Sequence, residues 1–471
     1  MTVRSGPIDD HQLAALRRRF RGPLIGPGEP GYEQGRSVWN RMIDRRPALI
    51  ARCTCVADVV AVVEFARTGG FFPAIRGGGH GAPGYAVCQD DIVIDLSLMK
   101  DIQVDALRGR ARAQSGLTWG EFDRATQAHG LATPGGEVSS TGISGLTLGG
   151  GYGILSRKYG LTCDNVRSFE LVTADGRTIA ASRAERPELF WALRGGGGNF
   201  GVVTSIEYTL HRVGPVVLGG MMVYPFDQAR DVLRFYRDLG RSAPEELGLN
   251  LIVAHARDLA CMPASLRGAR VIMILCCWHG PLELGEAVLR PLRAFGAPLV
   301  DRLGPLAYVD QQRLLDELAG PGRSYWKSGF FAEDGLTDAA IEVFVEQAAR
   351  ITGPRTMIEI KTVGGAIARA KHGETALEDR AGAHIGAIVA KWDDPAEDPR
   401  HMAQAREFHA AMTPFHVGGN YLNYLNGERE DRIRAVYGAA YDRLRAVKRS
   451  YDPDNMFRRN QNISPAHGDG P

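Results

Sequence analysis

The sequence predicts an α+β protein of two or three domains. Its 471 residues exceed what one compact core usually holds. Before about residue 213, short strand-like runs alternate with helical runs, whereas beyond residue 215 the strand-like runs alternate with longer helices. The second pattern is typical of a sheet covered by helices. With 44% hydrophobic and 23% charged residues, the composition is that of an ordinary soluble globular protein.

The elements of the first part follow from apolar periodicity and from the residues that end them. Gly130 is placed to end a helix, and an Asp-Gly pair between two β-rich runs indicates a hairpin. The pattern predicts strands at 47–52, 71–77 and 91–97, helices at 56–68 and 116–130, and the hairpin at 169–182.

In the second part, apolar runs of strand length alternate with amphipathic segments. A last helix ends before Pro453, since proline cannot continue a helix. The pattern predicts strands at 216–225, 269–278, 356–366 and 384–392, and helices at 226–240, 282–296 and 430–452.

Charge and cysteine content exclude several classes of protein. A net charge of +2, with basic residues spread along the chain, favours solvated helix faces over a nucleic-acid surface. Seven cysteines without a C-x-x-C pair favour a reduced protein without a metal site. The N-terminus lacks the apolar segment of a signal peptide, and no run reaches the roughly 18 apolar residues that span a membrane. We therefore expect a cytoplasmic protein with neither nucleic acid nor membrane as partner.

Three glycine clusters stand out in a chain in which 58 residues are glycine. They are RGGGHG (76–81), GLTLGGGYG (145–153) and RGGGGNFGVV (194–203). Glycine-rich backbone lets N–H groups converge on phosphate oxygens, so the clusters indicate a phosphate-bearing cofactor; tight turns are the alternative. RGGGHG is followed by loop and strand instead of a helix, and no P-loop motif occurs. Neither the dinucleotide fingerprint nor the P-loop therefore explains the clusters.

His80 lies among glycines and has no apolar face to pack against. It could act as a general base, a metal ligand or a nucleophile, but no second ligand lies at metal-binding spacing nearby. A neutral imidazole can attack the methyl group of an oxidised flavin and form a permanent bond. RGGGHG would then combine a nucleophile with a pyrophosphate cradle.

Long motifs along nearly the whole chain carry a family resemblance. They include RRPALIARC, RGGGHG, GISGLTLGGGYGILSRKYGLTCDN, ELFWALRGGGGNFGVVT, RSYWKSGF, NYLNYLNGERED and YDPDNMFRRNQNI. The chain resembles the berberine-bridge-enzyme-like FAD-linked oxidases of the p-cresol methylhydroxylase/vanillyl-alcohol oxidase superfamily. The resemblance implies a two-part PCMH-type FAD-binding domain, residues 1–213 and 419–471, interrupted by an α+β substrate domain, residues 214–418, with an antiparallel sheet covered by helices.

The resemblance also implies which residues hold the cofactor. His80 would carry FAD through its 8α-methyl group, and the backbone of residues 76–81 would cradle the pyrophosphate. Such a covalent bond keeps the flavin bound and tends to raise its potential. The implied FAD-binding residues are Arg76, Gly77, Gly78, Gly79, His80, Gly81, Ser140, Thr141, Gly142, Gly145, Gly151, Val203, Tyr421 and Asn423.

The chain departs from the family where many relatives attach FAD a second time through a cysteine. That position is Val138 here, so we expect a single tether. Cys163 lies elsewhere in the pattern and is predicted to be a small buried residue. Thr141 would lie near the flavin face where dioxygen reacts, or would bond its own backbone as an ordinary loop threonine.

On the substrate side, the resemblance makes Tyr424 of YLNY the general base. A free phenol has a pKa near 10, so it needs a nearby cation to work at neutral pH. Strand alternation places Glu359 and Lys361 on one face, where Lys361 could lower the Tyr424 pKa and Glu359 could orient it. Alternatively, both are a surface pair on an outward face. Gly386 occupies a position where some relatives have a carboxylate, so C–H activation of the berberine-bridge type is not expected.

Together these features predict an FAD-dependent oxidoreductase of a small alcohol, sugar or secondary-metabolite intermediate. Hydride would pass to flavin, Tyr424 would take a proton, and dioxygen would reoxidise the cofactor. One alternative is a flavin-dependent oxygenase of a secondary metabolite, with Thr141 in a confined oxygen pocket. Another is a non-redox cyclase in which Tyr424 and Lys361 act and the flavin is structural. The oligomeric state stays open, with a homodimer as one option.

Overall fold

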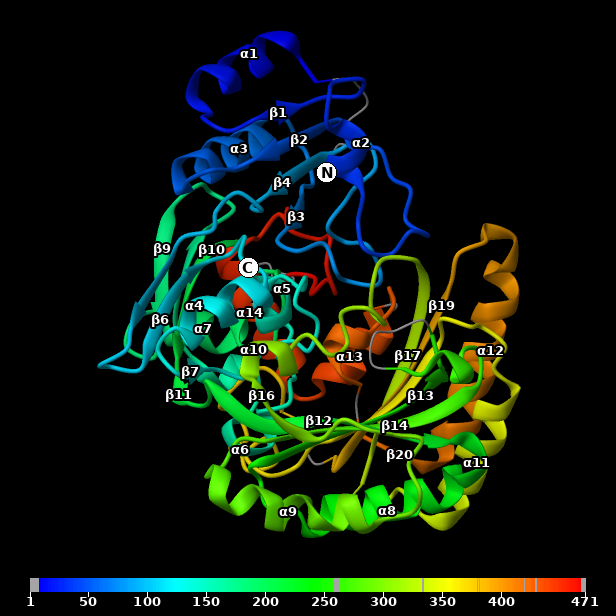
Figure 1. Ribbon diagram of the computed structural model, residues 1–471. Coiled ribbons are helices and arrows are strands. Elements are labelled where there is room, and N and C mark those ends of the chain that lie inside the picture. Colours follow the sequence, from blue (N-terminus) through cyan, green and yellow to red (C-terminus); the bar gives the residue numbers. More distant parts are fainter. Residues whose placement is uncertain are drawn as a thin grey trace.

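The computed structural model describes residues 8–257, 262–332, 334–378, 380, 382–418, 420–427 and 430–466. Within these residues the strands form four sheets (Figure 1). The three smaller sheets and their helices lie at the top and left of the view, and one large sheet lies below them. The mixed α+β architecture is the predicted one. No helix in the described part of the chain is long and apolar enough to cross a membrane.

The first small sheet is mixed and has the strand order β1-β2-β4-β3. Strands β2, β4 and β3 are parallel, and β1 joins antiparallel to β2. Valine-rich α3 packs its buried face against this sheet together with the inner side of α1. The bounds are α1 (Asp10–Arg19), β1 (Leu24–Ile25), α2 (Tyr32–Arg36), β2 (Leu49–Arg52), α3 (Val56–Thr68), β3 (Ala74–Arg76) and β4 (Ile92–Asp95).

The second sheet is antiparallel, with the order β5-β6-β10-β8-β9, and a two-stranded pair, β7 and β11, lies beside it. Strands β8 and β9 form the predicted hairpin. The bounds are β5 (Ile102–Asp105), β6 (Arg110–Gln114), α4 (Trp119–Gln127), β7 (Leu131–Ala132), α5 (Ile143–Leu148), α6 (Ser156–Tyr159), β8 (Val166–Val172), β9 (Thr178–Ser182), α7 (Pro187–Leu193), β10 (Val202–Thr209) and β11 (His211–Arg212).

The large sheet is antiparallel, with the order β15-β12-β14-β13-β18-β19-β17-β20 and β16 paired to β12. Its strands are β12 (Val216–Pro225), β13 (Leu247–His255), β14 (Arg270–Trp278), β15 (Val300–Asp301), β16 (Gly304–Ala307), β17 (Arg323–Phe331), β18 (Met357–Thr362), β19 (His384–Trp392) and β20 (His416–Val417). Its helices are α8 (Ala229–Ser242), α9 (Leu282–Ala294), α10 (Tyr308–Gln311), α11 (Asp338–Arg350) and α12 (Asp398–Met412).

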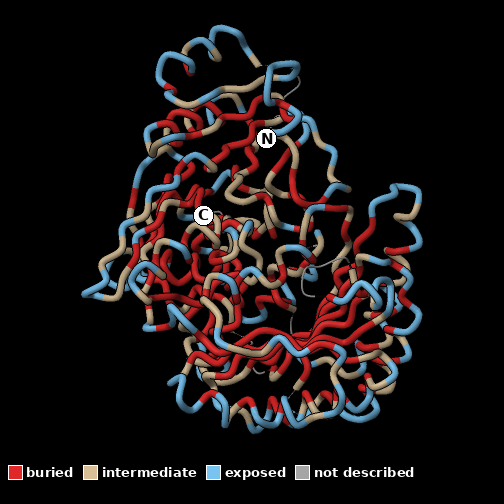
Figure 2. Tube along the Cα trace, viewed as in Figure 1, coloured by how far each residue is buried: buried red, intermediate tan, exposed pale blue. Residues whose placement is uncertain are grey.

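The two faces of the large sheet have different neighbours. Helices α8, α9, α11 and α12 cover one face, and Ile358 and Ile360 of β18 point into that core. Met357 and Ile252 lie on the opposite face, which looks toward the smaller sheets. Both faces are buried along most of their length, as the red tube in Figure 2 shows. Strand alternation therefore divides β18 between a helix-covered core and a second, inner face.

The C-terminal segment returns to the second sheet. Helices α13 (Glu430–Tyr437) and α14 (Ala440–Tyr451) contribute Tyr437, Tyr441 and Leu444 to the core that also contains Phe190 and Trp191 of α7. The sequence predicted one helix over 430–452. The structure breaks it at Gly438, whose φ of +50° is incompatible with a continuous helix.

Other differences concern strands and helices that the pattern did not predict. Strands β13 and β17 were missed, as were helices α11 and α12. The predicted strand at 356–366 ends at Thr362, because Gly364 and Gly365 both have positive φ. Since β13 is buried on both faces, its sequence LGLNLIVAH lacks the strict alternation that marks a strand with one exposed face.

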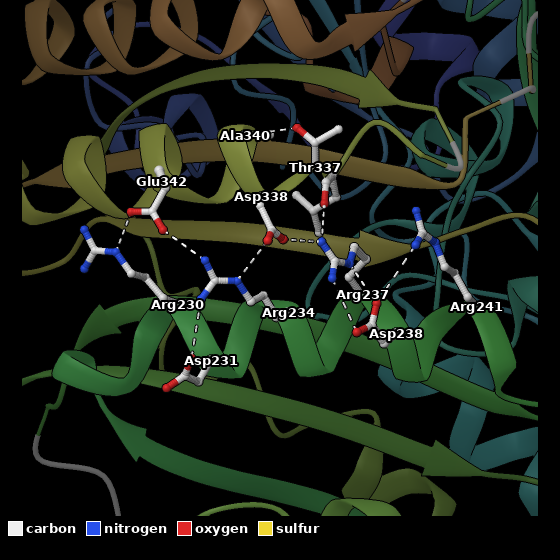
Figure 3. A network of polar contacts seen from close by, with 11 residues as sticks. Arg230, Asp231, Arg234, Arg237, Asp238, Arg241, Thr337, Asp338, Ala340 and Glu342 are labelled. Atoms are coloured by element: carbon white, nitrogen blue, oxygen red, sulfur yellow. Dashed lines mark hydrogen bonds and ion pairs between the residues drawn. The ribbon is translucent and has the colours of Figure 1, made fainter.

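An ion-pair ladder joins the outer helices α8 and α11 (Figure 3). Arg234 pairs with Glu342 and Asp338, and Arg237 donates to Asp338 at 2.7 Å. Arg230 Nε lies 2.5 Å from Glu342. Because most of these side chains are exposed, each pair contributes little to stability.

Candidate active site

A cavity of about 360 Å³ lies between the glycine loops and the inner face of the large sheet. It brings together most of the residues that the sequence assigned to cofactor and substrate. Of those residues, the cavity lining contains Gly77, Gly78, Gly79, His80, Gly81, Thr141, Gly142, Gly145, Val203, Lys361, Tyr421, Asn423 and Tyr424.

Two glycine loops form one wall of this cavity by direct backbone contact. A Cβ atom built on Gly78 would lie 2.3 Å from the backbone nitrogen of Gly142, and one on Gly142 would lie 2.3 Å from that of Gly78. Gly79 has φ +69°, which side chains disfavour. Residues with side chains at these positions would therefore push the loops apart.

Among the residues that the structure describes, the cavity lining offers unpaired hydrogen-bond acceptors as well as unobstructed backbone. Gln461 lines the cavity and is 8% exposed, yet its side-chain carbonyl has no hydrogen-bond partner within the described residues. The side-chain carbonyl of Asn460, also in the lining, is equally unpaired there. Buried carbonyls of this kind are normally hydrogen-bonded, so these two are suited to a bound group with N–H or O–H donors. The glycine wall, in addition, offers backbone that no side chain obstructs.

Three of the predicted cofactor-binding residues do not line the cavity. The guanidinium of Arg76 turns back to donate to the carbonyls of Gly35 and Ser37. Ser140 is exposed and contacts the ring of His80. Gly151 packs against Thr162, whose Oγ1 would lie 2.3 Å from an added Cβ. These residues shape the loops around the cavity.

His80 is held by contacts on both ring nitrogens and on its face. Its Nε2 lies 2.8 Å from Ser140 Oγ, and its Nδ1 lies 3.4 Å from Thr141 Oγ1. The ring stacks on Trp39, with centroids 5.5 Å apart. Burial, and then the charge of Lys391, lower the pKa of His80 to about 4. The imidazole is therefore neutral at pH 7, as a nitrogen nucleophile must be.

Thr141, Val138 and Cys163 differ in how they lie relative to the cavity. The hydroxyl of Thr141 faces His80 and the cavity, so Thr141 is not simply bonded to its own backbone. Val138, at the position of the second tether, lines the cavity as an apolar residue. Cys163 is fully buried away from the lining, and burial raises the pKa of its thiol to about 12. That thiol is therefore not a reactive thiolate.

The opposite wall carries a buried charged cluster on β18. The ammonium of Lys361 lies 2.9 Å from Glu359 and also contacts Glu137, which accepts a bond from Asn250. Glu359 is 7% exposed and Lys361 5% exposed, and both line the cavity. The alternative of an outward surface pair is therefore wrong. Burial lowers the pKa of Lys361, but the two carboxylates outweigh it and raise that pKa well above its usual value.

Tyr424 lies beside this cluster in a short helical turn, Leu422–Tyr424. Its hydroxyl is 3.5 Å from Glu359 Oε1, and the ammonium of Lys361 is 5.6 Å from the centre of its ring. Burial and then Glu359 raise the Tyr424 pKa, whereas Lys361 opposes them without prevailing. Lys361 lowers this pKa as expected, but burial, which is the largest effect, and Glu359 outweigh it. Tyr424 is a neutral phenol in this arrangement.

Tyr421 and Asn423 connect the C-terminal segment to the glycine wall. The amide of Asn423 donates to the carbonyl of Leu146 at 3.0 Å and to Tyr421 at 3.1 Å. A Cβ on Gly149 would lie 1.9 Å from Asn423 Oδ1, so the segment approaches the loop closely. Burial raises the pKa of Tyr421 to about 12, and the residue stays neutral.

Sequence reasoning missed Glu137 and the aromatic residues of the cavity. Trp326 meets Tyr424 edge-on, with centroids 5.2 Å apart, and Trp39 edge-on at 5.5 Å. Tyr152 lies under Lys361, 5.4 Å from its ammonium. A signal for Glu137 existed, since it is the one charged residue in GGEVSSTGISG (135–145). Trp39 and Trp326 come from distant segments and carried no such signal, whereas Tyr152 lies within the glycine cluster at 145–153.

Comparison with known protein families gives two matches. Residues 47–182 match the family described as FAD binding domain, and residues 420–464 match the family described as berberine and berberine like. The first match contains the His80 loop and the loop of Thr141. The second contains Tyr421, Asn423 and Tyr424.

Full-length relatives are also similar. The chain is 32% identical over 462 residues to (R)-6-hydroxynicotine oxidase of Paenarthrobacter nicotinovorans, covering 95% of this chain and 97% of the relative. It is 29% identical over 450 residues to an FAD-linked oxidoreductase of Dictyostelium discoideum, covering 95% of each. The crystal structure of 6-hydroxy-D-nicotine oxidase from Arthrobacter nicotinovorans superposes with a TM-score of 0.85 at 29% identity, covering 95% of this chain and 98% of that one.

Proposed function

The chain belongs to the berberine-bridge-enzyme-like family of FAD-linked oxidoreductases, and from that premise we propose that it is an oxidase of a small alcohol, sugar or secondary-metabolite intermediate with FAD attached to His80 alone. One observation carries the proposal. The cavity that the glycine wall and His80 border is the same cavity that Tyr424, Glu359 and Lys361 border from the sheet. A cofactor held by the first wall would lie next to the polar groups of the second.

The glycine wall supports the cofactor part of the proposal. The backbone of residues 77–81 and Gly142 would hold the pyrophosphate, and the neutral ring of His80 is the candidate nucleophile for the covalent bond. The side-chain carbonyls of Gln461 and Asn460, which have no partner among the described residues, could accept bonds from the cofactor. Bound there, FAD would supply a two-electron acceptor that dioxygen can reoxidise.

The cluster on the sheet supports the substrate part. Tyr424 is neutral, so its hydroxyl can hold a substrate oxygen, while Glu359 behind it can receive the proton. Lys361 keeps Glu359 in place through the 2.9 Å contact. Trp326 and Tyr152 give the cavity flat apolar surfaces that position a small substrate and exclude water.

A second candidate is oxidation at a carbon next to a basic nitrogen. The two carboxylates of Glu137 and Glu359 share a single ammonium group, that of Lys361. A cationic substrate bound between the aromatic side chains would therefore supply a second positive charge to balance them. One relative is named for 6-hydroxynicotine, which contains a basic nitrogen. The proposal further includes dioxygen as acceptor and a cytoplasmic location, because unpaired cysteines favour a reducing compartment.

The test is a substrate panel of small alcohols, oligosaccharides and amines, with oxygen uptake and peroxide measured together. An oxidase gives one peroxide for each substrate consumed. Less peroxide than substrate, with oxygen recovered in the product, would indicate an oxygenase instead. Under anaerobic conditions the substrate should bleach the yellow flavin; product formation without bleaching would contradict redox chemistry altogether.

A further inference from the structure

The ring of His80 rests on a junction outside the glycine loop. Trp39 stacks on it at an interplanar angle of 29° and donates from its indole nitrogen to the carbonyl of Ala319 at 2.7 Å. The next residue, Asn40, donates to the carbonyls of Ala82 and Ser324 at 2.7 and 2.9 Å. The segment 39–40 thus ties the histidine loop to strand β17 of the large sheet.

A buried lysine completes this junction. Lys391 of β19 is fully buried, its ammonium lies 4.6 Å from the centre of the Trp39 ring, and it donates to the carbonyl of Gly320. Burying an ammonium is costly, and the proposed reaction does not use this one. A cation on an aromatic face is attracted by the ring and restrains the ring it contacts. Trp39 therefore makes two ring contacts. The ammonium of Lys391 restrains its indole ring, and the same ring stacks on the imidazole of His80.

Three charged side chains in the described part of the chain act on Lys391, and two act on His80. Arg355, Arg257 and Asp393 act on Lys391, and Arg355 is itself paired with Asp393. Burial and then the two arginines lower the pKa of Lys391 to about 7. Lys391 and Asp316 act on His80 with opposite sign, and the effect of Lys391 is the larger.

We propose that Lys391 is a positioning residue for the attachment of flavin to His80. Its ammonium fixes the indole of Trp39, the indole fixes the plane of the imidazole, and the positive charge disfavours protonation of His80. This proposal rests on the proposed covalent FAD. In the attachment, a ring nitrogen of neutral His80 bonds to the 8α carbon, one proton leaves that carbon and a second leaves the imidazole. The two electrons stay on the flavin until dioxygen takes them, with two protons, as hydrogen peroxide.

The test follows covalent incorporation of FAD into apoprotein from below the His80 pKa of about 4 up to pH 9. Protein is denatured at intervals, and the flavin retained on the chain is measured. Below the Lys391 pKa of about 7, where the wild-type lysine carries its charge, we expect attachment in Lys391→Met to be at least about 10-fold slower. The acid limb of the rate should also move to higher pH, because His80 loses the neighbouring charge that keeps it unprotonated. Lys391→Arg should restore most of the rate, since it keeps the charge over Trp39.

Controls separate this role from a merely structural one. His80→Ala and the double variant His80→Ala/Lys391→Met should bind FAD non-covalently with equal affinity if the junction is intact. If the Met variant does not fold, Lys391→Gln, which keeps a donor to Gly320, replaces it. Wild-type rate and pH profile in the folded variant would overturn the role of Lys391. Absence of any covalent flavin in the wild type would instead overturn the His80 tether itself.

Discussion

The two walls of the cavity differ in the atoms that they present to it. The wall on the side of the small sheets presents backbone, with Gly78 and Gly142 so close that neither can carry a side chain. The wall on the large sheet presents side chains, with Lys361 between Glu137 and Glu359. At these glycines the first wall has no side chains, which leaves room for a ligand. The second wall buries charged groups, and only their mutual pairing offsets the free energy that their desolvation costs. Substitutions should therefore fail in different ways on the two sides.

Adding a methyl group to a glycine of the backbone wall should have the largest effect on FAD binding. In Gly78→Ala the new Cβ meets backbone instead of a movable side chain, so the loops must separate. We expect purified protein with little or no FAD and no measurable oxidase activity. Gly304→Ala is the control, because nothing lies within 4 Å of its added Cβ. Flavin absorbance per protein measures the effect; full occupancy in Gly78→Ala would contradict the role of close backbone contact.

Removing the ammonium of Lys361 from the side-chain wall should mainly lower the free energy of unfolding. Lys361→Met leaves two buried carboxylates without their partner, which costs about 3 kcal/mol or more in the free energy of unfolding. Glu137→Gln added to Lys361→Met should recover part of the loss. The matched control is Lys100→Met, whose ion pair with Glu121 is exposed and is expected to contribute less than about 1 kcal/mol. Equal losses in the two lysine variants would show that burial of the cluster is irrelevant.

Tyr424→Phe sharpens the comparison by separating catalysis from cofactor binding. The ring stays, but the hydroxyl 3.5 Å from Glu359 is lost, so kcat should fall about 100-fold with FAD content unchanged. Tyr325→Phe on strand β17, outside the cavity lining, serves as control. Steady-state oxygen uptake gives kcat. An unchanged kcat would remove Tyr424 from the proton transfer.

The smallest effect is expected for an ion pair that lies at the surface of the molecule. Glu342 pairs with Arg230 and Arg234 in the ladder of Figure 3, and its side chain is 40% exposed. Glu342→Gln should change the free energy of unfolding by about 0.5 kcal/mol, and the change should shrink in 1 M salt. Urea unfolding at two salt concentrations measures it. A loss as large as that of Lys361→Met would mean that burial does not set the strength of these pairs.

The same contrast explains what the sequence could predict. The glycine wall comes from runs that are continuous in the chain, so RGGGHG and GLTLGGGYG pointed to it directly. The alternation of β18 correctly placed Glu359 and Lys361 on one face. Trp39 and Trp326 reach the cavity from distant segments, and only tertiary packing brings them there, whereas Glu137 lies in the same loop as Gly142. Lys361 lowers the Tyr424 pKa as the sequence suggested, but burial of the phenol outweighs it, and that burial depends on tertiary packing.

The most direct test of the central claim is the mass of the flavin-carrying peptide. The purified protein is denatured and digested, and each cysteine- and histidine-containing peptide is examined for bound FAD. We predict flavin on the peptide containing His80 and on no other, because valine occupies the expected position of the second tether and the Cys163 thiol is buried and protonated. Flavin on the Cys163 peptide would contradict the single tether, and a flavin-free His80 peptide would contradict the assignment of the glycine wall to a covalently held cofactor.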